Sequence, residues 1–420
     1  MPKRPTLFDP VNFGALALAN RIVMPPMTRS RALTDGSPGP STRLYYAQRA
    51  SAGLVISEGI VVSPEGVGGP GIPGLWNATH VAGWKEVTDA VHAQAGTMVA
   101  QLWHTGRASH PSFQPDGKIP VGPSPVKISG LTFTEEGRVP YVVPRPLNLD
   151  EIQIIVGQFA EAAKNALKAG FDGVEIHAAN GYLIDQFLQD SANLRTDRYG
   201  GSVQNRARLL IETVDAVIGV TGSERVGVRI SPSSVFQDMT DSDPEALFGY
   251  VISELAKRDL AYLHLVEPGI IGNDDHTAAH RPADNIDSSW ARKRYAGNLI
   301  ATGGYVRDRA VHAVASGVVD AVGFGRDFIA NPDLPTRLAR NTHIAEAQRP
   351  TFFGGDNRGY LDYPSLAAEQ HLLDLRSGRI EPTPNLGLDA ETQHDLWHVA
   401  WANAQHAENR PVADPSASPH

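Results

Sequence analysis

Residues 169–176 read Ala169-Gly170-Phe171-Asp172-Gly173-Val174-Glu175-Ile176. Gly170 follows a segment of helical periodicity at 150–169, and glycine at that place is typical of a residue that ends a helix. The apolar run that comes next is short, which predicts a buried strand over residues 173–176. A helix that leads directly into a buried strand is the repeating unit of parallel α/β folds.

The same succession recurs about eight times along the chain, and no block of strands alone or helices alone interrupts it. The predicted strands are short apolar runs at 22–24, 54–62, 98–102, 173–176, 225–230, 262–266, 299–301 and 321–324. Helices are predicted near 41–52, 80–95, 150–169, 204–219, 244–258, 288–295, 306–316 and 332–341. Eight such units predict an α/β fold of the (β/α)8 TIM barrel type, whose active site lies at the carboxyl ends of the strands.

Two segments depart from the repeating pattern. Residues 106–147, after the third strand, are rich in Pro and Gly, so we expect a loop with a small hairpin or lid over the barrel mouth. The barrel is expected to occupy residues 1–366, and a C-terminal extension residues 367–420. In that extension Trp397 and Trp401 form an apolar stripe on a helix expected at about 389–408, before a flexible end. We expect a monomer, or a homodimer formed through this extension.

The composition excludes several classes of function. The chain has 420 residues, 41% of them hydrophobic, and a formal charge of -9, which argues against a surface for nucleic acid or anionic membranes. It has no cysteine, so disulfides, thiolate catalysis and Cys-ligated metals are excluded. The amino terminus shows no apolar stretch long enough for a signal peptide or a membrane span. We therefore expect a cytoplasmic protein whose partner is a small molecule.

The residues that follow the fourth predicted strand suggest a chemistry. His177 and Asn180 can donate hydrogen bonds to a carbonyl or nitro oxygen, and Tyr182 can deliver a proton to carbon as charge moves onto that oxygen. The reaction indicated is reduction of an activated carbon–carbon double bond. The alternative is purely structural: a strand followed by a helix start, with His177 satisfied in the core and Tyr182 packed on its ring.

Polar residues and glycines follow the other predicted strands. Thr28 and Gln101 can hydrogen-bond the edge of a flat heterocycle, and Arg229 can place positive charge where such a ring accumulates negative charge. The phosphate site of this fold is usually built after strands seven and eight, where the chain has Gly303, Gly304, Gly325 and Arg326. Each of these residues alone also fits a structural role, as a turn, a salt bridge or a buried polar contact.

Taken together, these motifs resemble the Old Yellow Enzyme family of flavin-dependent ene-reductases, from residue 7 to about residue 364. The resemblance rests on the stretches at 20–29, 101–107, 177–182, 195–202, 229–232 and 323–327. It implies non-covalently bound FMN, with NADPH as the reductant and enones, enals, maleimides or nitroalkenes as substrates. Threonine at 28, where one branch has cysteine, is similar to the branch typified by the yeast and enterobacterial enzymes.

The resemblance also implies a role for each site residue. It assigns the substrate oxygen to His177 and Asn180, and proton donation to Tyr182. Trp103 is expected in the wall of the substrate pocket, and Phe353 at a place where a tyrosine often reaches it. The flavin is expected to be lined by Pro26, Thr28, Gly59, Gln101, Arg229, Gly303, Gly304, Gly325 and Arg326.

Other patterns compete with this interpretation. The stretch 66–71 formally matches GxGxxG, but it contains a proline and no helix is predicted directly after it. It also lacks the aromatic residue that many relatives have near position 69. A metal-dependent hydrolase or lyase would use Asp274, Asp275, His276 and His280, which a solvated loop explains better, so no metal site is expected. A flavin protein that stores or senses without turnover is the remaining alternative.

Overall fold

Eight parallel strands close into a barrel in the computed structural model, which describes residues 4–271, 274–275 and 286–377. They are buried almost throughout, as expected of parallel strands that are covered on both faces. The (β/α)8 barrel predicted from the sequence is confirmed. In chain order the strands are β3 (Ile22–Met24), β4 (Leu54–Val61), β5 (Met98–Trp103), β10 (Gly173–Ala178), β11 (Val226–Ile230), β12 (Tyr262–Val266), β15 (Leu299–Thr302) and β16 (Ala321–Gly323).

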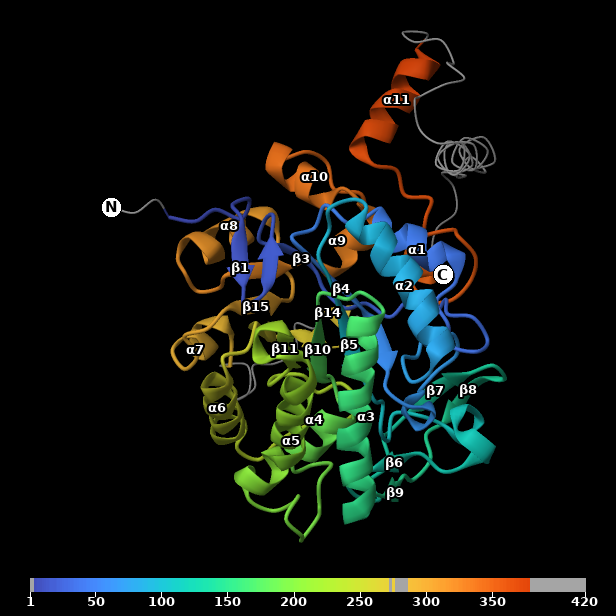
Figure 1. Cartoon of the computed structure of the whole chain (residues 1–420), viewed down its shortest axis with the longest axis vertical. Helices are drawn as coiled ribbons and strands as arrows, with labels where there is room; N and C mark the ends of the chain where they lie inside the picture. Colours follow the sequence, from blue (N-terminus) through green and yellow to red (C-terminus); the bar gives the residue numbers. More distant parts are fainter. Residues whose placement is uncertain (1–3, 272–273, 276–285, 378–420) are drawn as a thin grey trace, which may run out of the picture.

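Helices surround these strands (Figure 1) and are close to the predicted positions. The predicted ones are α1 (Pro40–Ala47), α2 (Ala78–His92), α3 (Leu149–Lys168), α5 (Val203–Thr221), α6 (Pro244–Leu255), α7 (Ser288–Arg292), α8 (Arg307–Ala315) and α10 (Leu334–Arg340). Three further helices were not predicted: α4 (Leu183–Leu188), α9 (Gly325–Ala330) and α11 (Leu366–Arg376). The last of these, α11, projects away from the barrel in Figure 1.

The barrel closes where its last strand meets its first. Strand β16 pairs with β3 through Val322 beside Ile22 and Gly323 beside Val23. The Arg21 guanidinium adds a side-chain hydrogen bond of 2.8 Å to the carbonyl oxygen of Asp320. This seam joins segments that lie 299 residues apart in the sequence.

An N-terminal hairpin, which was not predicted, covers the amino-terminal end of the barrel. Its strands are β1 (Val11–Phe13) and β2 (Leu16–Leu18), and Phe13, Leu16 and Leu18 pack into one buried cluster with barrel residues such as Val23 and Ile56. At the turn, Gly14 has a φ of +58°, and a Cβ there would lie 2.4 Å from the carbonyl oxygen of Glu224. The close approach leaves room only for glycine, and the opposite end of the barrel remains the mouth.

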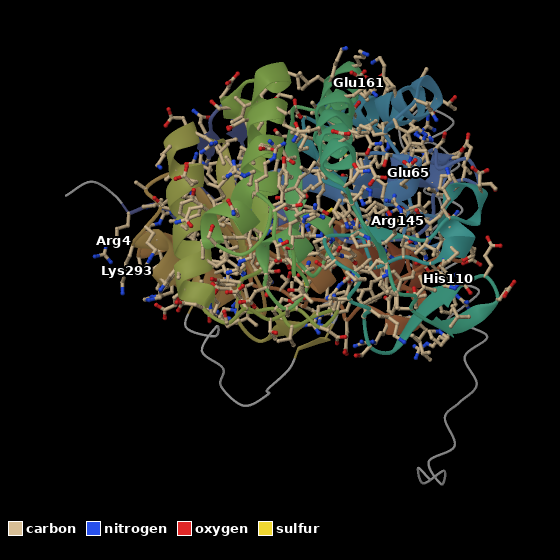
Figure 2. All side chains as sticks on the ribbon, turned by 90° about the horizontal axis from the view of Figure 1, so that it is seen from below. Arg4, Glu65, His110, Arg145, Glu161 and Lys293 are labelled. Carbon is tan, nitrogen blue, oxygen red and sulfur yellow. The ribbon has the colours of Figure 1, made fainter. Side chains whose placement is uncertain are left out.

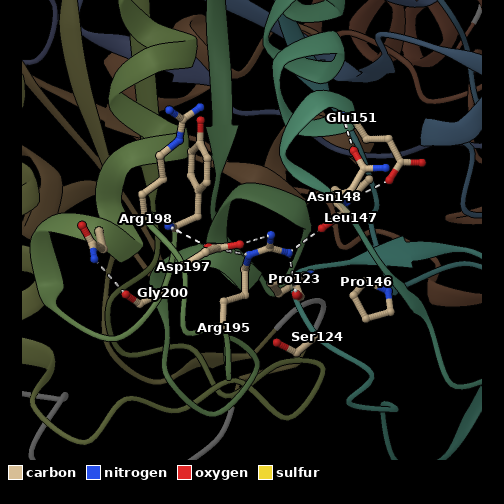
Figure 3. Close-up of polar contacts among 12 residues, drawn as sticks. Pro123, Ser124, Pro146, Leu147, Asn148, Glu151, Arg195, Asp197, Arg198 and Gly200 are labelled. Carbon is tan, nitrogen blue, oxygen red and sulfur yellow. Dashed lines mark hydrogen bonds and ion pairs between the residues drawn. The ribbon is translucent and has the colours of Figure 1, made fainter.

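The insertion between β5 and α3 contains the predicted hairpin. Its strands β7 (Leu131–Thr134) and β8 (Gly137–Pro140) are antiparallel, while β6 (Val121–Gly122) and β9 (Arg145–Pro146) pair at its base. The Arg195 guanidinium crosses that base and donates to the carbonyl oxygens of Pro123 at 3.1 Å and Leu147 at 2.6 Å (Figure 3). Asp197 holds the same guanidinium in an ion pair. In the stretch 195–202, Arg195 and Asp197 therefore have a structural role at the base of the insertion.

We expect Arg195→Ala to loosen residues 124–146. A hydrogen bond from a charged group contributes about 1.5–3 kcal/mol, so local opening should increase roughly tenfold or more. Limited proteolysis of the insertion measures this effect. The matched control is Arg145→Ala, since the Arg145 side chain (labelled in Figure 2) is 49% exposed and its ion pair with Glu151 is partly open to solvent. Equal cleavage of the two variants would contradict the role of Arg195.

Several expectations concern residues outside the described part of the chain. The helix at about 389–408, with Trp397 and Trp401, lies among them, as do His276 and His280. Asp274 and Asp275 form strand β14, which pairs with β13 (Ile270–Ile271). In the described ranges, no group of three or more acidic or histidine side chains could hold a metal ion. Within the same ranges, no helix is both long and apolar enough to cross a membrane.

Candidate active site

The predicted site residues lie at the carboxyl ends of the barrel strands. Gln101 and Trp103 are at the end of β5, His177 is at the end of β10, and Arg229 is beside His177 on β11. Thr28 follows β3 in a partly exposed segment. Because parallel strands in a barrel all end at the same side, these side chains share the mouth.

Three aromatic rings of the site contact one another. The Trp103 and Tyr182 rings meet edge to face at 4.7 Å between centroids, and those of His177 and Tyr182 are 5.3 Å apart. His177 and Trp103 are each 5% exposed, whereas Tyr182 is partly exposed. Tyr182 comes immediately before α4, so the start of that helix presents its ring to the mouth. The structure thus brings the predicted proton donor and oxygen ligand together, and it places the predicted pocket residue Trp103 beside them.

The pKa values of these groups suit neutral hydrogen-bond donors. Burial, and then the charges of Arg229 and His264, lower the pKa of His177 well below its usual value. Its imidazole is therefore neutral at pH 7. Burial, together with the nearby Tyr141, raises the pKa of the Tyr182 hydroxyl above its usual value of 10, so that hydroxyl retains its proton.

Asn180 and Gly181 form a left-handed turn between β10 and α4. Their φ angles are 57° and 73°, and the first of these is unusual for a residue other than glycine. The backbone N–H of Asn180 donates to Ser231 Oγ at 2.7 Å. A Cβ on Gly181 would lie 2.6 Å from the carbonyl oxygen of Phe236. The turn is therefore packed tightly against the loop after β11.

A chain of hydrogen bonds crosses the barrel interior beneath the mouth. Gln101 Nε2 donates to Glu175 at 2.8 Å, and the other carboxylate oxygen of Glu175 contacts His264 Nδ1 at 2.8 Å. His264 Nε2 contacts the Thr302 hydroxyl at 2.7 Å. His264 is thus a buried histidine whose two ring nitrogens are both hydrogen-bonded. Burial opposes ionisation of Glu175, but the neighbouring His264 and Arg229 hold its pKa below its usual value.

Several positions at the mouth favour glycine over any other residue. A Cβ on Gly59 would lie 2.5 Å from the Trp103 ring, at a point where the pairing of β4 with β5 shifts register. Gly303 and Gly304 have φ angles of 146° and 60°, which strongly favour glycine. Gly325 begins α9, and the neighbouring Arg326 side chain is exposed.

The ring contact described for Phe353 is with Phe352 and not with Trp103, His177 or Tyr182. The Phe353 ring is 49% exposed and meets that of Phe352 at 6.4 Å between centroids. The main chain here is tied to Arg29, next to Thr28, because Arg29 Nε donates to the carbonyl oxygen of Phe352 at 2.9 Å. The segment therefore borders the mouth beside Thr28.

Known proteins are similar to most of the chain. Residues 6–344 match the NADH:flavin oxidoreductase / NADH oxidase family. The chain belongs to that family. Putative 12-oxophytodienoate reductase 5 of Oryza sativa subsp. japonica is 44% identical over 362 residues, which cover 85% of this chain and 94% of the relative. Flavin oxidoreductase hxnT of Emericella nidulans is 41% identical over 381 residues, covering 85% and 97%.

Solved structures of flavin oxidoreductases have the same fold. Morphinone reductase in complex with tetrahydroNAD gives a TM-score of 0.80 at 46% identity, covering 86% of this chain and 98% of that one. The Old Yellow Enzyme homologue from Zymomonas mobilis gives 0.82 at 44% identity, covering 86% and 99%. The resemblance to the Old Yellow Enzymes is thus confirmed, and the chain is a flavin-dependent oxidoreductase.

The mouth of this flavin oxidoreductase fits the cofactor that its family implies. Three buried nitrogen atoms there have no hydrogen-bond partner within the described ranges: Trp103 Nε1, His177 Nδ1 and Arg229 Nε. Buried polar atoms in native proteins are normally paired, so these three indicate a ligand with acceptor oxygens or nitrogens. The nearest atoms to the place of a Cβ are 3.9 Å away at Gly304 after β15 and 3.7 Å away at Gly325 after β16, and such open backbone suits the close approach of a phosphate.

Sequence reasoning missed several residues of this oxidoreductase site. Tyr141, from the segment after β8, lies close enough to influence the pKa of Tyr182. Gln237 belongs to the loop that packs on Gly181. The sequence predicted Glu175 only as a strand residue, and it predicted no role for Asp185. A charged residue inside a strand buried along its whole length was the available signal for Glu175.

Proposed function

We propose that the protein is an FMN-dependent ene-reductase that uses NADPH to reduce activated carbon–carbon double bonds in enones, enals, maleimides or nitroalkenes. The single observation that carries this proposal is that buried nitrogens of Trp103, His177 and Arg229 have no hydrogen-bond partner among the described residues, while the Trp103 and His177 rings contact the Tyr182 ring. FMN, when bound, supplies hydride to the substrate after reduction by the nicotinamide. The names of the relatives, 12-oxophytodienoate reductase and morphinone reductase, support a reductase of this class.

Each site residue has its own role in the proposed reaction. His177 and Asn180 donate hydrogen bonds to the substrate oxygen and stabilise the negative charge that develops there. Tyr182 transfers its proton to the α-carbon. Trp103 forms the adjacent wall and Phe353 borders the pocket, and no step requires a metal. The cofactor would be held by Pro26, Thr28, Gly59, Gln101, Arg229, Gly303, Gly304, Gly325 and Arg326.

The first test is the cofactor itself. The purified protein should be yellow, and heating should release a compound that chromatography identifies as FMN. Added enone should then accelerate NADPH oxidation. A colourless protein that does not take up FMN would refute the proposal, and a yellow protein without turnover would favour storage or sensing.

The choice between NADPH and NADH and the oligomeric state are two separate proposals. The morphinone reductase structure holds tetrahydroNAD, so NADH is the competing reductant. The ratio of kcat/KM for NADPH and NADH decides between them. We also propose that the protein is a monomer or a homodimer, and light scattering on the purified protein measures which.

A further inference from the structure

The Asn180–Gly181 turn is held by side chains at two successive amides. The Asn180 N–H donates to Ser231 Oγ at 2.7 Å, and the Gly181 N–H donates to Asp185 Oδ2 at 2.8 Å. Left-handed backbone is costly at Asn180 unless the surroundings enforce it, whereas Gly181 adopts it without strain. These two hydrogen bonds are therefore direct constraints on the segment that carries Asn180 and Tyr182.

Asp185 is fully buried, and each of its carboxylate oxygens accepts a hydrogen bond. Oδ2 accepts from Gly181, and Oδ1 accepts from Gln189 Nε2 at 2.8 Å. Both hydrogen bonds are charge-assisted while the carboxylate is ionised, and a protonated carboxyl, one oxygen of which carries its own proton, holds these donors less strongly. The geometry thus favours the ionised form.

Burial acts in the opposite direction. It raises the pKa of Asp185 to about 7, against the hydrogen bonds from Gln189 and Gly181. Of the charged groups that face this carboxylate, Arg107 lowers the pKa and Asp241 raises it. Asp241 itself forms an ion pair with Arg206.

The turn also has a non-titrating support. Gln186 Nε2 donates to the carbonyl oxygens of Gly181 at 2.7 Å and Thr105 at 3.0 Å. Its Oε1 accepts from the Arg107 amide at 3.1 Å. The peptide group after Gly181 is thereby fixed on its carbonyl side, whatever the charge of Asp185. Loss of that charge should therefore release the Gly181 amide without unfolding α4.

We infer that Asp185 is a positioning residue for the reaction: through the Gly181 amide, its carboxylate holds the turn that presents Asn180 and Tyr182, and protonation loosens that turn. The inference rests on the proposed function for the roles of Asn180 and Tyr182. It makes the geometry of the site depend on pH near neutrality, although neither residue titrates there itself.

Three variants separate charge from packing. Asp185→Asn keeps the size and, after rotation of the Gln189 amide, can accept from Gly181 without a charge. Asp185→Ala leaves the Gly181 amide without its partner. Ser231→Ala is the matched control, because it removes the neighbouring support, which does not titrate.

Hydrogen exchange measures the backbone amides of Asn180 and Gly181 directly. It is recorded on the FMN-loaded protein and expressed as protection relative to the intrinsic rate. In the unsubstituted protein the Gly181 amide should be roughly tenfold less protected at about pH 6 than at about pH 8. Asp185→Asn should remove this pH dependence, and Asp185→Ala should give low protection throughout. Ser231→Ala should expose the Asn180 amide equally at all pH values. A pH-independent Gly181 amide, or the same dependence in Asp185→Asn, would overturn the inference.

Steady-state turnover provides a second test of the inference. The kcat for an enone should fall below about pH 7 in the unsubstituted protein, because protonation weakens the hydrogen bond by which Asp185 holds the turn. The kcat of Asp185→Asn should not change over the same pH range, because asparagine does not titrate. The KM for NADPH should be unchanged. Exchange that follows pH without a matching change in kcat would preserve the link from Asp185 to Gly181 and would instead refute the proposed roles of Asn180 and Tyr182.

Discussion

Tyr182→Phe is expected to slow the reoxidation of the reduced protein by an enone roughly 10²-fold or more, which is the usual contribution of a positioned general acid. Its reduction by NADPH should be little changed. The reason is that the substitution removes only the hydroxyl and leaves the edge-to-face contact with Trp103 in place. Stopped-flow absorbance measures the two half-reactions separately.

Two comparisons make this experiment decisive. Nitroalkenes should lose less rate, because a stabilised nitronate can leave and take its proton from solvent. Tyr141→Phe removes the other nearby hydroxyl and should have a much smaller effect. If both half-reactions slow equally in Tyr182→Phe, or if Tyr141→Phe matches it, then Tyr182 is not the proton donor.

The second large effect concerns the oxygen ligands. His177→Ala and Asn180→Ala should each weaken the binding of a phenol, whose oxyanion resembles the developing negative charge, by about 1.5–3 kcal/mol. That corresponds to a Kd roughly 10- to 150-fold higher. Titration followed by the flavin spectrum gives these constants, and the flavin content should be retained.

Backbone strain needs its own control at position 180. Asn180 has a φ of 57°, so alanine there introduces strain in addition to removing the amide. Asn180→Gly removes the same amide without the strain. Equal losses in the two variants would assign the effect to the hydrogen bond, whereas unchanged phenol affinity in all three substitutions would contradict the assignment of the substrate oxygen.

The barrel strands were predictable because each is a short and mainly apolar run between helical segments. Strands β3 and β12 have the predicted bounds, and the other barrel strands differ by one or two residues. The helices α4 and α9 were missed because six residues are too few to show a helical period. The N-terminal hairpin was missed for the same reason, since each of its strands has three residues.

The site was predictable where function depends on a local motif. His177, Asn180 and Tyr182 stand together in the sequence, and the barrel rule assigns their neighbours to one end. The contacts that support them were not predictable in this way. Glu175 meets His264 across 89 residues, and Asp185 acts on Gly181 through a carboxylate that looks like an ordinary helix residue. Such pairings depend on three-dimensional packing, which the sequence of a single segment does not predict.

The seam between β3 and β16 has a consequence for synthesis of the chain. The ribosome releases β3 long before β16, so the growing chain holds an open sheet with unpaired edges until about the last barrel strand emerges. Unpaired edges recruit strands from other molecules. Contacts across 299 residues, such as Arg21 with Asp320, also form late and slowly. Aggregation during production should therefore be greatest for chains truncated before Ala321, and much smaller once Gly323 can pair with Val23.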